Sequence, residues 1–206
     1  MAKINLKLKL IFIINFLIIL LAINLKSYAE DSKLQTNLII GSENAKVKIK
    51  VFSSLTCPHC ADFHINIVPK IKKNYIDSGK VQLNLIDFPL DQAGFNASKL
   101  LHCVDKEKKL VFLDTIYENQ SKWAVGDDIK KIENNLKKIV KDLGINSSQF
   151  DKCLNNEVIS DKILNDRIDG HKKYSINSTP TIIINEKKFE GNADYKNIKK
   201  KIEKLI

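Results

Sequence analysis

The sequence predicts an α/β fold with an inserted all-helical subdomain, and three observations support this prediction. Residues 47–85 have the periodicity of a strand, a helix and a second strand, which is the order of a right-handed β-α-β unit. Residues 92–162 carry helix-like patterns only. A strand-like run and a final helix follow within residues 163–206. We therefore expect residues 30–91 and 163–206 to form one α/β domain, interrupted by the helical insertion 92–162.

The β-α-β unit is defined by alternation and spacing. After a short polar lead over residues 30–44, apolar residues alternate with polar ones over 47–52 and again over 81–85, which predicts two strands. Pro69 should kink the helix between them, because proline has no N–H and its ring clashes with the preceding turn. The apolar stripe of this helix has four members: Phe63, Ile67, Ile71 and Tyr75.

Four helices are expected in the insertion, with Trp123 as a hydrophobic plug among them. The third should end at Gly144, since glycine is favoured just past a helix C-terminus. The four are predicted at residues 97–104, 110–119, 129–143 and from Ser148 onwards. After them we expect a helix at 159–174, a buried strand at 182–184, a short returning strand at 187–190 and a closing helix at 195–206.

Two cysteines, two residues apart, lie where the first strand meets the first helix. The sequence Cys57-Pro58-His59-Cys60 at such a junction is typical of a thioredoxin-like redox site. A helix N-terminus has unpaired N–H groups and partial positive charge, so the Cys57 sulfur should be stabilised as the reactive thiolate. Pro58 suits the first helical position, and a protonated His59 would add positive charge. Cys57 should then be the exposed attacking sulfur and Cys60 the buried resolving one.

The stabilisation of this thiolate sets the direction of the chemistry. Each pKa unit corresponds to about 1.4 kcal/mol, which is roughly 30 mV for a two-electron couple. Lowering the Cys57 pKa by a few units would therefore shift the pair by roughly 100 mV towards an oxidant.

Metal and haem sites are less consistent with this motif. Zinc needs about four ligands, and the sequence has no second Cys-x-x-Cys to supply them. Haem attachment needs a histidine directly after the second cysteine, where this chain has Ala61. The other histidines, His64, His102 and His171, lack ligand spacing. We expect neither a metal nor a cofactor.

The first 29 residues predict a secretory signal peptide. A basic start is followed by an apolar run over residues 10–25 and by the small residues Ser27 and Ala29, so cleavage is expected before Glu30. The apolar run is shorter than the ~20 residues of a spanning helix, which favours a cleaved leader over a membrane anchor. Export to the periplasm would place the four cysteines in a compartment where disulfides form.

The charge distribution argues against nucleic-acid binding. The formal net charge is +10, but four of the 34 basic residues and none of the 24 acidic ones lie in the leader, which leaves +6. The remaining lysines are spread along the chain at helical spacing, as on solvated helix faces.

Four motifs agree in order and spacing: residues 54–61 around the two cysteines, the turn at 87–91, Thr179-Pro180-Thr181, and the hairpin that ends at Gly191. Together they resemble the DsbA-like thiol:disulfide oxidoreductases, over nearly the whole chain after the leader. The resemblance implies a thioredoxin fold and a periplasmic or extracytoplasmic location. It also implies oxidation of dithiols in reduced secreted proteins, and recharging by a membrane quinone-linked partner.

Carried over by position, the resemblance makes Cys57 the nucleophile and Cys60 its partner. Pro180 matches the cis-proline beside the active cysteines, and Thr179 would offer backbone groups to an extended substrate peptide. From the sequence alone, Pro180 could equally begin a strand in the trans form. The chain departs from the family at Val51, where members commonly keep a buried acid that relays protons to the second cysteine. Water or another carboxylate would have to serve here.

Cys103 and Cys153 are left over, on predicted helices of the insertion. They could be two buried thiols or a disulfide that braces the insertion. A bridge closing a loop of about fifty residues would contribute roughly 4 kcal/mol on the chain-entropy treatment. Some members of the family carry such a second bridge, and we expect one here.

We predict an exported, monomeric protein disulfide oxidoreductase that introduces disulfides into secreted proteins. One alternative is a reductase or isomerase of the same fold, which a reduction potential would distinguish. Another is a non-catalytic copper carrier that uses Cys57, His59 and Cys60, since soft thiolates suit Cu(I). Metal content of the reduced protein would distinguish the carrier.

Overall fold

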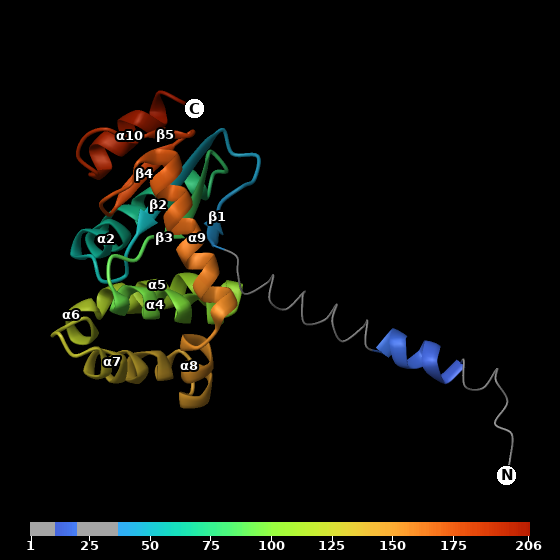
Figure 1. Ribbon diagram of the computed structural model, residues 1–206. Helices are drawn as coiled ribbons and strands as arrows, with labels where there is room; N and C mark the ends of the chain where they lie inside the picture. Colours follow the sequence, from blue (N-terminus) through green and yellow to red (C-terminus); the bar gives the residue numbers. More distant parts are fainter. Residues whose placement is uncertain (1–10, 20–36) are drawn as a thin grey trace, which may run out of the picture. The chain divides into compact units, whose positions relative to one another are not determined.

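The computed structural model describes residues 11–19 and 37–206 of the chain (Figure 1). The chain divides into two compact units, Met1–Thr36 and Asn37–Ile206. In the first unit, residues 11–19 form an exposed helix. No helix among the described residues combines the length and the apolar character needed to cross a bilayer. The predicted leader cleavage between Ala29 and Glu30 lies outside the described residues.

The second unit is built on a five-stranded mixed sheet with the strand order β1-β3-β2-β4-β5. Strands β2 and β3 run parallel, with Val47 opposite Val81 and Ser53 opposite Asp87, which confirms the predicted β-α-β unit. The other neighbouring strands are antiparallel. The strands are β1 Leu38–Ile40, β2 Val47–Ser53, β3 Val81–Asp87, β4 Thr181–Ile184 and β5 Lys187–Lys188.

Strand β1 shows that the prediction of a polar lead over residues 30–44 was wrong in part. Leu38 is buried and pairs with Leu85 of β3. Three residues are too few for alternation to be recognised. Gly41 then turns the chain at a φ of 99°, and a side chain there would lie 2.4 Å from the Val81 carbonyl. The short strand thus covers one edge of the sheet.

The helix that follows the two cysteines is continuous but not uniform. It consists of α2 Pro58–Asp62, η1 Phe63–Ile67, α3 Val68–Ile71 and η2 Lys72–Ile76. The segments η1 and η2 are wider π turns, on either side of Pro69. Because Pro69 offers no N–H to the preceding turn, a widened turn accommodates it inside the helix.

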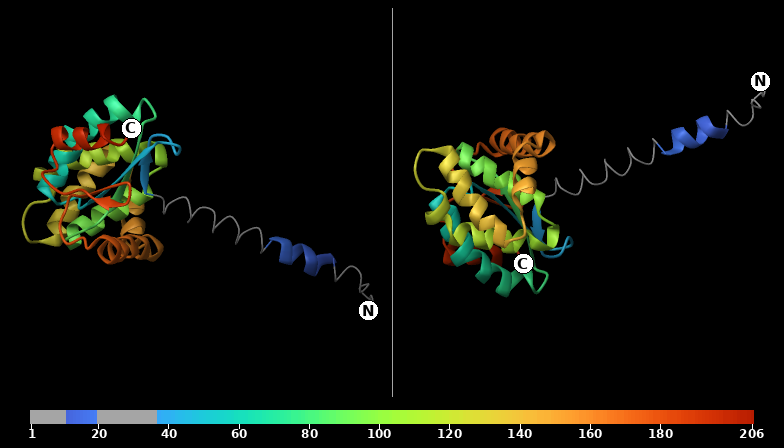
Figure 2. Two further views of the ribbon diagram at one scale, coloured as in Figure 1. Left: turned by 90° about the horizontal axis from the view of Figure 1, so that it is seen from above. Right: turned by 90° about the horizontal axis from the view of Figure 1, so that it is seen from below.

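Helices cover both faces of the sheet. The helix after the cysteines and α10 (Tyr195–Glu203) lie on one face, and α9 (Glu157–Tyr174) lies on the other (Figure 2). Alternate residues of β2 divide accordingly: Val51 packs on the α10 side and Phe52 on the α9 side. Gly170 allows α9 to approach closely, because a side chain there would lie 2.8 Å from the Phe52 ring.

The insertion is wholly helical within residues 92–162, as predicted. Its helices are α4 Gln92–Cys103, η3 Lys106–Lys108, α5 Lys109–Glu118, α6 Gln120–Trp123, α7 Ile129–Asp142 and α8 Ser147–Leu154. Helix α4 begins five residues before the predicted start at residue 97. The reason is Asp91, whose carboxylate accepts a hydrogen bond from the Gly94 N–H at 2.7 Å and caps the helix.

The core of the insertion extends to the redox motif. Trp123 is fully buried, as predicted for a plug, and its indole N–H donates to the Ile116 carbonyl at 2.9 Å. The same apolar cluster contains Leu55, Cys57 and Cys60 from the other part of the chain. The insertion therefore packs directly on the segment that carries the two cysteines.

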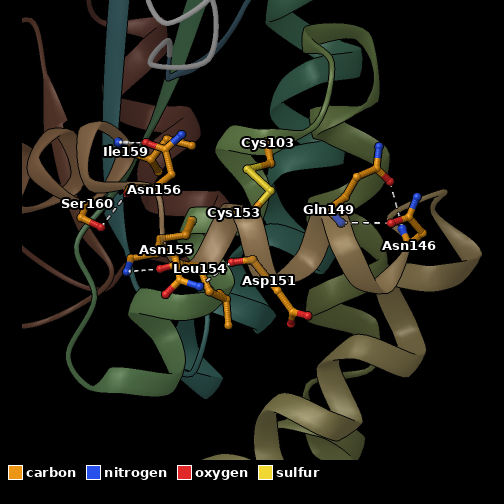
Figure 3. Close-up of a disulfide and its surroundings, with 11 residues drawn as sticks. Cys103, Asn146, Gln149, Asp151, Cys153, Leu154, Asn155, Asn156, Ile159 and Ser160 are labelled. Carbon is orange, nitrogen blue, oxygen red and sulfur yellow. Dashed lines mark hydrogen bonds between the residues drawn. A yellow bond between two sulfur atoms is a disulfide. The ribbon is translucent and has the colours of Figure 1, made fainter.

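Cys103 and Cys153 form a disulfide that joins α4 to α8 (Figure 3). The two residues are 50 positions apart in sequence, and their Cα atoms are 6.1 Å apart. Next to the bridge, Asn146 and Gln149 form a capping box at the start of α8, with two hydrogen bonds of 3.0 Å (Figure 3). The cap stabilises the start of α8, and the bridge fixes α8 against α4.

Replacing this bridge in Cys103→Ala/Cys153→Ala should lower the free energy of unfolding by roughly 4 kcal/mol, because the unfolded chain regains the entropy of a fifty-residue loop. Denaturant unfolding should be measured in a Cys57→Ala/Cys60→Ala background, so that only one cysteine pair differs between the two proteins. A loss below about 1 kcal/mol would show that the bridge braces little.

Candidate active site

The redox motif occupies the turn between β2 and α2. Cys57 is the N-cap residue of α2, in extended conformation, and Pro58 is the first helical residue. The N–H groups of Cys60 and Ala61 both donate to the Cys57 carbonyl at 3.1 Å. Cys57 is 8% exposed and Cys60 is 1% exposed. The order of exposure matches the prediction, but Cys57 is far more covered than expected because helices of the insertion pack around it.

The environment polarises the two sulfurs in opposite directions. A hydrogen bond with the Cys60 side chain is the main reason that the pKa of Cys57 falls to about 5. Thr179 and the backbone N–H groups of Cys60 and His59 also lower the Cys57 pKa, and together these outweigh the effect of burial. The same hydrogen bond and burial raise the pKa of Cys60 well above its usual range. Cys57 is therefore the thiolate, and Cys60 is a thiol that donates to it.

His59 is exposed, and its backbone N–H is the part that supports the thiolate. The turn itself is the source of this support, because N–H groups at the start of a helix have no partner inside the helix. A tuning role for the His59 imidazole and for Pro58 stays a prediction.

The loop before β4 brings Thr179 and Pro180 beside Cys57, 122 residues away in sequence. The Thr179–Pro180 peptide bond is cis. The Cys57 sulfur lies 3.4 Å from the Thr179 carbonyl oxygen, to which Cys57 can donate only in its protonated form. Thr179 and Pro180 are half-buried at the edge of the site. This arrangement places the backbone of Thr179 and Pro180 next to the Cys57 sulfur.

Gln120, at the start of α6, is a site residue that the sequence did not suggest. Its amide donates to the Leu55 carbonyl at 2.8 Å and to the Cys57 carbonyl at 3.1 Å. The insertion thereby holds the backbone of the active-site loop. A glutamine has no spacing signal that could have revealed this role.

A second set of hydrogen bonds, made by the Thr56 hydroxyl, also holds the redox loop. The Thr56 hydroxyl donates to the Asp91 carboxylate at 2.7 Å and lies 2.9 Å from the Ser54 hydroxyl. Gly94 fits closely under both hydroxyls, since a side chain there would lie 2.8 Å from the Ser54 oxygen. The turn at residues 87–91 thus supports the redox loop directly.

No group of three or more histidine, cysteine or acidic side chains in the described part of the chain is placed to hold a metal ion. The arrangement is instead suited to thiol–disulfide exchange, which needs one activated sulfur, a partner sulfur beside it and a nearby backbone segment.

Comparison with known proteins identifies the family. The sequence profile of the family described as Thioredoxin matches residues 33–204. The probable disulfide bond formation protein D of Bacillus cereus is 31% identical over 179 residues, which cover 83% of this chain and 79% of that protein. The crystal structure of Wolbachia pipientis alpha-DsbA1 superposes with a TM-score of 0.75 at 30% identity, over 82% of this chain and 90% of the other. The chain belongs to the DsbA-like oxidoreductases of the thioredoxin family.

A second DsbA-like structure agrees with this assignment. BdbD from Bacillus subtilis, in its oxidised form, superposes with a TM-score of 0.71 at 26% identity, over 82% of this chain and 92% of the other. The predicted thioredoxin fold with a helical insertion is therefore confirmed, and so is the prediction of an oxidoreductase.

This DsbA-like chain has no acid at Val51, which is fully buried on β2. The neighbouring strand β3, however, ends in a buried acid, Asp87. Its carboxylate accepts a hydrogen bond from Ser98 at 2.6 Å and pairs with His102 at 2.7 Å. Burial alone would raise the pKa of Asp87, but the hydrogen bonds from His102 and Ser98 outweigh it and lower that pKa. His102 is thus a partner of Asp87.

Proposed function

We propose that this DsbA-like oxidoreductase is an exported oxidase that introduces disulfides into secreted proteins through Cys57 and Cys60. The observation that supports the proposal is the low pKa of Cys57 beside the raised pKa of Cys60. A stabilised thiolate favours the reduced dithiol, so the corresponding disulfide is a strong oxidant.

The proposed reaction begins when a substrate thiolate attacks the Cys57 sulfur of the Cys57–Cys60 disulfide. Cys60 leaves and a mixed disulfide forms between the substrate and Cys57. The second substrate thiolate then attacks the substrate sulfur, and Cys57 leaves readily because its thiolate is stabilised. Two electrons pass from the substrate dithiol to the enzyme, which ends as a dithiol.

We assign substrate binding to Thr179 and Pro180. An extended substrate segment laid against Thr179 could pair with its backbone as an added strand, which would bring the substrate sulfur to Cys57. Thr179 is half-buried beside the Cys57 sulfur, which supports the assignment.

The location and partners form the rest of the proposal. The leader pattern of residues 1–29 supports export to the periplasm, where reduced secreted proteins would be the substrates. A membrane quinone-linked partner would reoxidise the dithiol. The names of the relatives as disulfide bond formation proteins support a role in disulfide formation. We further propose that the protein acts as a monomer.

The reduction potential of the Cys57–Cys60 pair tests the proposed direction. We expect a value nearer to that of a strong oxidant, about −120 mV, than to that of thioredoxin, about −270 mV. Equilibration with glutathione buffers of known ratio, followed by acid trapping and mass analysis, gives this value. A potential near −270 mV would assign the protein to the reductases.

A further inference from the structure

Thiol–disulfide exchange requires a group that accepts the proton of Cys60. The apolar side chain of Val51, at the position where family members commonly keep an acid, cannot do this. Cys60 is 1% exposed and its pKa is raised, so it is protonated at neutral pH and out of contact with bulk water. It must lose this proton before it can attack a mixed disulfide at Cys57, because the thiolate is the nucleophile. A group near Cys60 therefore has to accept the proton.

A small cavity lies directly behind Cys60. Its volume is about 20 Å³, and its lining includes Cys60, His64, Asp87 and Tyr117. This is room for one water molecule, which needs about 10–15 Å³. The polar groups in the lining offer the partners that such a water requires. Cys60 and two candidate proton acceptors, His64 and Asp87, thus line the same small cavity.

His64 is better suited to accept a proton than Asp87. Both carboxylate oxygens of Asp87 already bind Ser98 and His102, which hold its pKa below the usual range and make it a weak base. Burial lowers the pKa of His64, although Asp114 and Glu118 oppose this, so the imidazole is neutral at neutral pH. A neutral imidazole is a stronger base than a carboxylate of lowered pKa.

His64 also connects the cavity to solvent. It lies four residues after Cys60 in the same continuous helix, and both residues line the cavity. Its Nε2 atom is 2.7 Å from a carboxylate oxygen of Asp114 on α5, so in the neutral ring Nε2 carries the hydrogen and donates it. The side chain of His64 is 4% exposed, whereas that of Asp114 is 50% exposed. The His64–Asp114 pair therefore connects the cavity with solvent.

We propose that His64 and Asp114 form a proton relay between Cys60 and solvent during thiol–disulfide exchange. The Cys60 thiol gives its proton to a water in the cavity, and that water gives one to His64. His64 passes its Nε2 proton to Asp114, which releases it to solvent. The relay runs in reverse when Cys60 leaves as a thiolate. The inference rests on the proposed roles of Cys57 and Cys60.

Several titratable groups lie around His64 and the cavity. Asp114 and Glu118 of α5 act on the charge of His64. Tyr117 of α5 packs against the imidazole with ring centroids 4.9 Å apart, and its pKa is raised well above the usual value, chiefly by burial. Cys60 of α2 and Asp87 of β3 also line the cavity, Cys57 acts on Cys60, and His102 and Lys162 act on Asp87.

Oxidation of the reduced protein by glutathione disulfide separates the two chemical steps. In the first, the Cys57 thiolate attacks one glutathione sulfur, the glutathione S–S bond breaks and one glutathione thiolate leaves. In the second, Cys60 loses its proton and attacks Cys57, which forms the Cys57–Cys60 disulfide and releases the other glutathione. The first step tests the proposed function, and the second tests the relay.

We expect His64→Gln to slow the second step by about tenfold or more at neutral pH, since general-base catalysis typically contributes 10²–10⁴-fold. The rate in this variant should then rise with hydroxide concentration, whereas the wild-type rate should level off. Asp114→Asn should slow the second step in the same direction, and it tests the relay independently if His64→Gln fails to fold. The first step should stay unchanged in both variants, because Cys57 needs no relay.

His171→Gln is the matched control, because it makes the same exchange on α9, away from the cavity lining. The Nδ1 atom of His171 contacts the Ile176 carbonyl at 2.9 Å, and a glutamine amide can also donate to that carbonyl. Both steps should be unaffected by it. Unchanged second-step rates in His64→Gln and Asp114→Asn would overturn the relay, as would a loss confined to Asp87→Asn. Failure of the first step in the wild-type protein would instead overturn the proposed function.

Discussion

Cys57→Ser should abolish dithiol oxidation, with a loss of at least about 10³-fold as for other nucleophile removals, whereas Cys60→Ser should keep the first covalent step. The reason is the opposite polarisation of the two sulfurs, which leaves Cys57 as the thiolate and Cys60 as the buried thiol. With glutathione disulfide, Cys60→Ser should accumulate a stable adduct of one glutathione at Cys57. Intact mass under non-reducing conditions measures this adduct.

The two serine variants serve as controls for each other, because each replaces one sulfur atom by oxygen in the same turn. Cys103 and Cys153 remain bridged in both, so a global defect would appear as a shared loss of stability. An adduct at residue 60 in Cys57→Ser, or equal activity in the two variants, would contradict the assignment of Cys57 as the nucleophile.

The stability of the reduced protein should depend steeply on pH, whereas that of the oxidised protein should not show this dependence. The folded-state pKa of Cys57 is lowered to about 5, and an unfolded thiol titrates near 8.5. Between these values the unfolded state binds one more proton, so stability rises with pH. The contribution is fully present above about pH 8.5 and is lost as the pH falls through about 5.

The expected slope is about 1.4 kcal/mol per pH unit, or roughly 4 kcal/mol between about pH 5 and pH 8. Cys60 does not disturb this window, because its raised pKa keeps it neutral in the folded state and an unfolded thiol is also neutral there. Denaturant unfolding of the reduced and oxidised proteins across this range measures the slope. Cys57→Ser should remove it, and a reduced protein without the slope would show that Cys57 titrates as an ordinary thiol.

Local signals in the sequence were enough to predict the redox loop and much of the fold. Cys57, Pro58 and Cys60 occupy the helix start that the motif predicted, because the electrostatics of a helix terminus depend on neighbouring residues only. The β-α-β unit and the all-helical insertion followed from periodicity. Strand β1 was missed because it is only three residues long, and the start of α4 was misplaced because the single Asp91 cap decides it.

Contacts between distant segments that neither a motif nor the family resemblance indicates could not be predicted. Gln120 binds the carbonyls of the redox loop across 63 residues, and His64 meets Asp114 across 50. Neither pairing leaves a periodic trace, because it depends on how the insertion packs on the sheet. The low exposure of Cys57 has the same origin. The sequence predicts which sulfurs react, but the contacts that lower or raise their pKa values could be identified only in the folded chain.

Helix α9 limits how the protein can accommodate its partners. It runs without interruption for 18 residues, about 27 Å, from the end of the bridged α8 to the loop that carries Thr179 and Pro180. The predicted boundary of the insertion, between residues 162 and 163, falls inside it. Because the helix is continuous there, the insertion and the sheet domain have no hinge at this boundary. Any backbone movement between the two parts would have to occur at other places, such as residues 88–91 or 155–156.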